Sequence, residues 1–193
     1  MNDARIRQAL HSRVIRHHHR SQNTLVIDEL GLYHGQSRID IAVINGKLSG
    51  YEIKSESDNL SRLPAQANYY NSIFGKLTLV VANKFLQQSL DIIPDWWGVI
   101  VAKRGTRDGI HLERVRPDSR NNNVDPYSLA MLLWRNEVIK LLQSVGYTGQ
   151  QLRQPRKRLY SHLVDALNPA EIQSIVCVAL KSRENWRYHE PPL

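Results

Sequence analysis

The chain has 193 residues, of which 41% are hydrophobic and 23% are charged, as is usual for a globular protein with a sizeable core. A formal net charge of +8 and a pI near 9.8 favour a polyanionic partner, either nucleic acid or an acidic membrane surface. One cysteine, Cys177, excludes an intramolecular disulfide and a cysteine-based zinc site. Because neither a secretory apolar region nor a membrane-spanning run is visible, we expect a soluble, cytoplasmic protein without a membrane partner.

The spacing of apolar residues defines the elements of the first 117 residues. Asn45-Gly46 is typical of a hairpin turn, and Pro64 breaks or restarts the first turn of the helix that follows. In chain order, the sequence predicts a helix over 4–20, a strand over 24–33, a hairpin over 38–56, a helix over 57–76, a strand over 77–84, a short helix over 85–90, a strand over 96–103 and an edge strand over 111–117.

The composition changes at a turn-rich linker over 116–126, and only helical patterns follow it. The expected helices cover 127–145, a run that starts in the basic stretch 151–160, and a last run that begins near Asn168-Pro169. These helices carry too many apolar residues for a solvated tail, so we expect them to pack on the rest of the protein. The sequence therefore predicts an α/β core over 1–118 and a helical C-terminal region over 119–193.

The hairpin carries charged residues in the most strand-like part of the sequence. Glu52 and Lys54 are two positions apart, so both project from one face of a strand. A two-residue turn would give paired positions an odd sum and place Asp40 on the other face. A three-residue loop with a bulge gives an even sum and places Asp40 beside Glu52 and Lys54. We predict the bulged loop, which would also place the apolar residues of the first strand, Ile39 among them, on the opposite face.

Two carboxylates on one strand face suit a hard cation such as Mg²⁺ or Mn²⁺, which prefers oxygen ligands and keeps several waters. Without a cation, the charges of Asp40 and Glu52 would repel and raise one pKa. Lys54 would orient a water molecule or stabilise a pentavalent phosphate, and attack of a metal-activated hydroxide on phosphorus is the reaction these groups suit. A plain, solvent-exposed hairpin face fits the same alternation and stays the alternative.

These residues resemble the motif of the PD-(D/E)XK nuclease superfamily. Asp40 matches the motif aspartate and Glu52-Ile53-Lys54 matches the (D/E)XK element, whereas Ile39 stands where the name has proline. The order of helix, strand, hairpin, helix and strand is also similar to that fold. The resemblance implies a restriction-endonuclease-like mixed central sheet flanked by helices, with an all-helical C-terminal part. It also implies that Asp40, Glu52 and the Ile53 carbonyl ligate Mg²⁺ or Mn²⁺.

Two further matches extend the resemblance. Members of the superfamily often use an acidic residue of the first helix or strand as an extra metal ligand; Glu29 is the candidate, Asp28 is its rival, and a structural Glu29 stays open. Gln66 and Tyr70 resemble the Gln-x-x-x-Tyr element of RecB-like nucleases, in which the two residues meet DNA or the catalytic lysine. At i and i+4 they face the same way, and an ordinary polar helix face is the alternative.

The resemblance implies a divalent-metal-dependent DNA phosphodiesterase with Asp40, Glu52, Lys54 and Gln66 in the catalytic centre. A non-catalytic nucleic-acid-binding accessory protein on the same fold and an RNA-cleaving relative are the alternatives. Many such nucleases cut as dimers, so a homodimer stays open. Besides Tyr70, the residues expected to contact nucleic acid are basic: Arg62, Arg153, Arg156, Lys157 and Arg158. For the last four, a basic loop that tethers two helices is the alternative.

Overall fold

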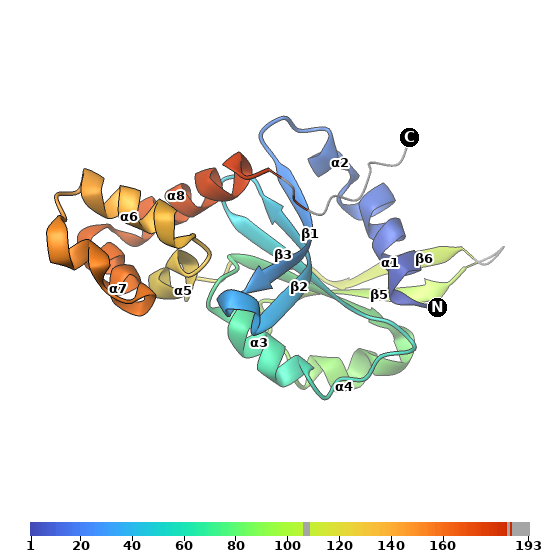
Figure 1. The fold of residues 1–193 in the computed structure, drawn as a ribbon. Helices are drawn as coiled ribbons and strands as arrows, with labels where there is room; N and C mark the ends of the chain where they lie inside the picture. The colour runs from blue at the N-terminus through green and yellow to red at the C-terminus, as the bar shows by residue number, and fades with distance from the viewer. Residues whose placement is uncertain (106–108, 185, 187–193) are drawn as a thin grey trace.

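The computed structural model describes residues 1–105, 109–184 and 186, and its centre is one mixed sheet (Figure 1). The strand order is β1-β2-β3-β4-β5-β6, with parallel pairing only at β3–β4 and β4–β5. The strands are β1 (Leu25–Leu32), β2 (Ser37–Ile44), β3 (Leu48–Lys54), β4 (Lys76–Ala82), β5 (Gly98–Arg104) and β6 (Ile110–Arg116). The α/β class with a mixed sheet, flanking helices and a helical C-terminal part is confirmed.

The helices divide into those interspersed with the strands and those that follow β6. The first group comprises α1 (Asp3–Ala9), the π-helix η1 (Leu10–Val14), α2 (Arg16–His19), η2 (Tyr33–Gly35), α3 (Leu63–Asn71), η3 (Asn83–Phe85) and α4 (Leu86–Leu90). The second comprises α5 (Pro126–Ala130), α6 (Arg135–Ser144), η5 (Gly149–Arg153), α7 (Arg156–Ala166) and α8 (Pro169–Ser182). Within the described part of the chain, none of these helices has the length and apolar character needed to cross a bilayer.

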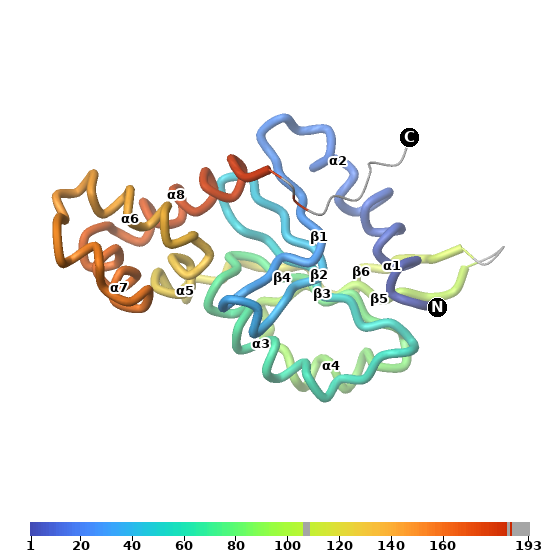
Figure 2. Tube along the Cα trace, viewed as in Figure 1, coloured from blue at the N-terminus to red at the C-terminus, as the bar shows by residue number. Residues whose placement is uncertain are grey.

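Helices cover both faces of the sheet, which explains why its central strands are apolar on both sides. Against one face, α1 and η1 bury Ile6 and Leu10 with Ile41 and Ile53. Against the other face lie α3, the following loop and the C-terminal helices, in one continuous apolar cluster. Figure 2 shows α1 and α3 on different sides of the strands.

The C-terminal helices gather at one end of the molecule, beside the hairpin strands (Figure 1). Their apolar residues belong to the same cluster as the α3 face of the sheet. Polar contacts join the two parts as well. The Tyr33 hydroxyl donates to Ser128 Oγ at 2.7 Å, and the Gln173 side chain donates to the Gly46 carbonyl at 3.3 Å. These contacts show packing of the helices on the sheet, while the division at residue 118 stays a prediction.

Three helix predictions need correction. The helix expected over 4–20 changes to π geometry at Leu10, and the helix expected over 57–76 is helical only from Leu63 to Asn71. The single helix expected over 127–145 is two helices, because Trp134 has an extended backbone and the Glu137 carboxylate accepts its N–H at 2.6 Å, which caps the start of α6. The apolar spacing runs through this break, so the sequence did not reveal it.

The predicted three-residue loop and the even-sum register of the hairpin are confirmed. Ile41 pairs with Tyr51 and Ile44 with Leu48, an even sum, and Gly46 has a φ of +88° in the three-residue loop. The face expected for Ile39 is wrong: its side chain joins the α3 cluster, whereas Ile41 joins the α1 cluster.

The change of face on β2 has a counterpart on β1. Ile27 and Leu30 lie in the same apolar cluster although three positions separate them, and between them Glu29 has a φ of +58°. A left-handed residue inside a strand breaks the simple alternation of faces, and such strained residues gather at functional sites. The strand pairing is interrupted at Glu29 and Asp40.

Candidate active site

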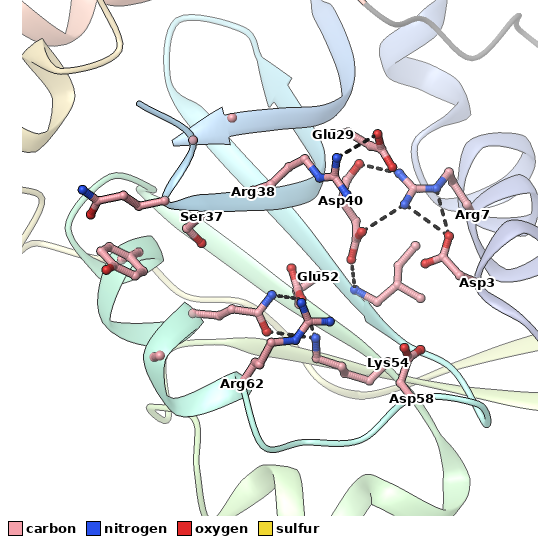
Figure 3. A pocket seen from close by; sticks show the side chains of 17 residues that line it. Asp3, Arg7, Glu29, Ser37, Arg38, Asp40, Glu52, Lys54, Asp58 and Arg62 are labelled. Carbon is pink, nitrogen blue, oxygen red and sulfur yellow. Dashed lines mark hydrogen bonds and ion pairs between the residues drawn. The ribbon is translucent and has the colours of Figure 1, made fainter. Parts of the chain in front are cut away.

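A cleft of about 670 Å³ opens where β1, β2 and β3 meet the start of α3 (Figure 3). Asp40, Glu52, Lys54 and Gln66 all line it, as do Glu29 and Arg62. The structure therefore brings together the four predicted catalytic residues and the predicted extra acid.

The floor of the cleft is an ion pair on β3. Lys54 Nζ donates to Glu52 Oε1 at 2.7 Å, and both residues are almost fully buried, at 4% and 2% exposure. A buried pair of charges requires further hydrogen bonds to offset the loss of water. On the α3 side these come from Gln66, which accepts from Lys54 Nζ at 2.9 Å and donates to Glu52 Oε1 at 2.7 Å.

Tyr70, which is buried on α3, is a further partner of Glu52. Its hydroxyl lies 2.9 Å from Glu52 Oε2 and 2.6 Å from the Arg38 carbonyl oxygen. The nucleic-acid contact expected for Tyr70 is wrong, because the side chain is 0% exposed and packs between α3 and the sheet. Its place is therefore under Glu52, where it can position the carboxylate. Gln66 takes the lysine-contacting role of its two expected roles.

Asp40 reaches the cleft from the neighbouring strand. Its Oδ2 accepts the Ile53 N–H at 2.7 Å, and its Oδ1 accepts from Arg7 of α1 at 3.0 Å. Arg7 also donates to the backbone carbonyl of Asp40 at 2.5 Å. Asp40 is thus fixed to β3 on one side and to α1 on the other (Figure 3).

The two acids of β1 diverge. Glu29 lines the cleft and lies 3.4 Å from Arg38, whereas Asp28 lies 2.9 Å from His11 Nε2 and 3.8 Å from Arg7. The left-handed backbone at Glu29 is the local reason for this divergence. Of the two rivals, Glu29 is the one in the cleft, and its role as a metal ligand stays a prediction.

Burial and like charge dominate the electrostatics of the cleft. Burial, and then the nearby Asp40 charge, raise the pKa of Glu52 to about 7, against the opposing effect of Lys54. Burial also raises the pKa of Asp40, although the Ile53 N–H and Arg7 counteract it. An added positive charge would stabilise the ionised form of both carboxylates, as expected from the sequence.

The donor set fits a hard divalent cation in type. Asp40 and Glu52 offer carboxylate oxygens, and Mg²⁺ is commonly held by one or two carboxylates together with water. The fit ends at two carboxylates: across the described ranges, no group of three or more His, Cys, Asp and Glu side chains is arranged to hold a metal. The oxygens of Asp40 and Glu52 already accept hydrogen bonds from the chain, so a cation would compete with those donors.

The predicted nucleic-acid contacts separate into two places. Arg62 is exposed at the rim of the cleft, just before α3. The other four, which are also exposed, lie at the end of η5 and the start of α7: Arg153, Arg156, Lys157 and Arg158. Arg156 Nη1 lies 3.2 Å from His34 Nδ1 in the η2 turn, so the start of α7 lies next to the sheet. Their contacts with nucleic acid stay predictions.

Arg7 and Arg38, which face acids of the cleft, are functional candidates that were not predicted from the sequence. Arg38 is two positions before Asp40 on β2, a spacing that indicates proximity on a strand. Arg7 follows Ile6 of the apolar helix stripe, but its partner on β2 depends on how α1 packs. No local pattern would have indicated that contact.

The fold and the cleft define a mixed α/β protein with a buried, charged site between its first three strands and α3. The chain belongs to the bacteriophage P4 protein cII family, whose profile matches residues 1–190. Protein cII of Enterobacteria phage P4 is 25% identical over 158 residues, which cover 82% of this chain and 59% of that protein. The match thus spans less than two thirds of that relative.

A similar solved structure is that of a protein of unknown function from Silicibacter pomeroyi. It is 16% identical, with a TM-score of 0.46, over 75% of this chain and 94% of that one. The names of the two relatives state no reaction, substrate or ligand.

Proposed function

We propose that this protein is a divalent-metal-dependent nuclease that hydrolyses phosphodiester bonds of DNA. The observation that carries the proposal is the buried Glu52–Lys54 pair with Asp40 beside it in one polar cleft. Buried charges are costly, and active sites are where such groups and raised pKa values tend to occur. The resemblance of these residues to the PD-(D/E)XK motif supports the same reading.

Asp40 and Glu52 are the residues that would hold Mg²⁺ or Mn²⁺, with the Ile53 carbonyl and Glu29 as further candidates. When bound, the cation would supply a Lewis acid that activates water and neutralises charge on the phosphate. Lys54 has three N–H donors, of which the chain uses two, on Glu52 and Gln66. The third would stabilise negative charge on a phosphate oxygen or orient water, while Gln66 holds the ammonium in place.

Positive charge around the cleft would bind the DNA backbone. Arg62 lines its rim, and the chain carries a formal net charge of +8. Each neutralised phosphate contributes about −0.9 to the slope of log K against log salt. DNA in a bacterial cell lies in the cytoplasm. The proposal therefore includes a cytoplasmic location for this protein. It is compatible with a homodimer, in which two clefts would cut two strands.

A second candidate is a non-catalytic nucleic-acid-binding protein. It is favoured by the hydrogen bonds of the cleft, since both carboxylates are satisfied by groups of the chain. In that case the charged residues would serve to hold β2, β3, α1 and α3 together. An RNA-cleaving enzyme would use the same groups as the DNA nuclease.

The test is cleavage of plasmid, linear duplex and single-stranded DNA and of RNA, with Mg²⁺, Mn²⁺ or EDTA. We expect metal-dependent cleavage of DNA by the wild type. We expect a loss of about 100-fold or more for Lys54→Met, because a group that stabilises transition-state charge is removed. Lys103→Met is the matched control, since Lys103 also pairs with a glutamate, Glu113 at 2.5 Å, but on the exposed β5–β6 hairpin.

Absence of cleavage with either metal would favour the binding protein. Equal cleavage by Lys54→Met and the control would contradict the assignment of Lys54 to the catalytic centre. Cleavage confined to RNA would select the RNA-cleaving alternative.

A further inference from the structure

A second hollow, of about 390 Å³, lies between β1 and the C-terminal helices. We call it the Trp134 hollow; it is lined by Gly31 and His34 on the sheet side, and by Trp134, Arg135 and Arg156 on the helix side. Gly31 also lines the cleft, and Gly35, next to His34, lines the cleft as well. The cleft and the hollow therefore meet at the exposed Gly31 of β1 and at the η2 turn.

Trp134 is a large apolar side chain that the fold leaves open. It is 59% exposed, although it lies between two well-packed helices, α5 and α6. One side of its ring rests on the Arg183 guanidinium, 4.2 Å from the ring centroid. Arg183 is held in turn by Glu137, at 2.6 and 2.9 Å, and by the Leu132 carbonyl at 2.8 Å. The ring thus rests on the Arg183 guanidinium, and its 59% exposure leaves surface on which a planar group can stack.

The charge around the ring is positive. Arg135 and Arg156 line the hollow, and no Asp or Glu is among its described lining residues. The acid of α6, Glu137, forms an ion pair with Arg183. Leu132, Leu133 and Leu180 provide an apolar wall. Aromatic rings with nearby cations bind unpaired bases and their phosphates, and duplex bases cannot stack in this way while paired.

We propose that the Trp134 hollow binds an unpaired base of single-stranded nucleic acid, whose backbone crosses Gly31 into the cleft. The inference rests on the proposed function and narrows its substrate class to strands with an unpaired segment next to the cut. Gly31 suits the crossing, because it is exposed and even a Cβ atom built there would meet no atom within 4 Å. Arg156 and Arg135 would contact the phosphates that flank the stacked base.

The test is the affinity of the intact protein for a fluorescein-labelled single-stranded oligothymidine and for a labelled duplex, measured by anisotropy in EDTA. We expect Trp134→Ala to weaken binding of the single strand about tenfold, as stacking of one base predicts. Duplex affinity should stay within about twofold. Trp134→Phe should retain most of the single-strand affinity. Val178→Ala, at another exposed apolar residue of the C-terminal helices, should change neither.

The inference is overturned if Trp134→Ala leaves single-strand affinity unchanged, or lowers single-strand and duplex affinity equally. Circular dichroism and the Trp134→Phe variant separate a loss of stacking from a loss of fold. Because EDTA removes the metal, the result is independent of cleavage. If the protein cleaves DNA but Trp134→Ala leaves its single-strand affinity unchanged, this inference alone is overturned. One that binds through Trp134 but never cuts overturns the nuclease proposal alone.

Discussion

The cleft and the Trp134 hollow lie side by side but are built in opposite ways. In the cleft, acids and bases of the chain neutralise one another: Lys54 faces Glu52, and Arg7 faces Asp40. In the hollow, Arg135 and Arg156 are lining residues together with the exposed Trp134 ring, and no acid is among the described lining residues. Buried and compensated charges suit a site whose geometry must be fixed, whereas open positive charge beside an aromatic ring suits the capture of a polyanion.

The two regions should therefore respond differently to mutation. Glu52 and Lys54 are 2% and 4% exposed, whereas Trp134 is 59% exposed. Changes in the cleft should reduce the free energy of unfolding together with any activity. Changes in the hollow should leave stability nearly unchanged and affect binding alone.

The largest expected effect is that of Glu52→Ala on stability. It leaves the Lys54 ammonium buried without its carboxylate and removes acceptors from Gln66 and Tyr70. We expect a loss of about 3–5 kcal/mol in the free energy of unfolding. Urea denaturation monitored by circular dichroism measures it. Glu113→Ala, which breaks an exposed pair, is the control, and an equal loss for the two variants would contradict a cleft built on a buried pair.

The next effect is a pH dependence of the metal-free protein. The pKa of Glu52 is raised from 4.5 to about 7, so the folded state binds more protons than the unfolded state between these values. The contribution of Glu52 to stability is therefore full below about pH 4.5 and is lost as the pH rises through about 7, by up to about 3 kcal/mol.

Glu52→Gln isolates this contribution, because it removes the titrating group and leaves the histidines in place. The difference between the wild-type and Glu52→Gln unfolding free energies should change across that window. A constant difference between pH 4 and 8 would show that Glu52 keeps an ordinary pKa.

A smaller effect concerns the salt dependence of DNA binding. Arg156→Ala should make the slope of log K against log salt shallower by about 0.9, as expected for one phosphate contact. Lys140→Ala removes the same charge from an exposed position of α6 that does not line the hollow, so its slope should match the wild type. If both variants and the wild type have equal slopes, Arg156 does not contact a DNA phosphate.

The smallest effect is expected at Gly31, where cleft and hollow meet. Gly31→Ala should bind single-stranded DNA as the wild type does, because a Cβ there meets no atom within 4 Å. Gly31→Ile should weaken that binding a few-fold, since a branched side chain would stand in the path of the backbone. Anisotropy with the same oligothymidine measures the affinity of both variants. If Gly31→Ile binds as tightly as the wild type, the strand does not cross Gly31 between the hollow and the cleft.

Much of the cleft was predictable, because its residues follow strand and helix spacing. Alternation placed Glu52 and Lys54 on one face, and the i, i+4 spacing put Gln66 and Tyr70 on one side of α3. The requirement that Asp40 share the face of Glu52 selected the even-sum hairpin register, which the structure shows. Spacing does not tell how deeply a side chain is buried. For that reason Tyr70 was placed at the nucleic acid, although it lies beneath Glu52.

The features that depend on tertiary packing were not predictable. The contact of Arg7 with Asp40 requires α1 to dock on β2, and a left-handed Glu29 inside a strand has no sequence signal of its own. The exposure of Trp134 has no sequence signal, because the apolar pattern of 127–145 continues through it. Only the break between α5 and α6 exposes the ring.

The most direct test of the nuclease proposal is the Mg²⁺-dependent rate of DNA cleavage of wild type and Asp40→Asn, measured beside the affinity of each for the same DNA. Asparagine keeps the shape of the side chain, and it retains an acceptor for the Ile53 N–H. We expect the cleavage rate to fall by about 100-fold or more while affinity stays within about twofold, because distributed positive charge provides the affinity. Equal cleavage rates for the two proteins, or no cleavage by the wild type, would contradict the assignment of the cleft as a nuclease site.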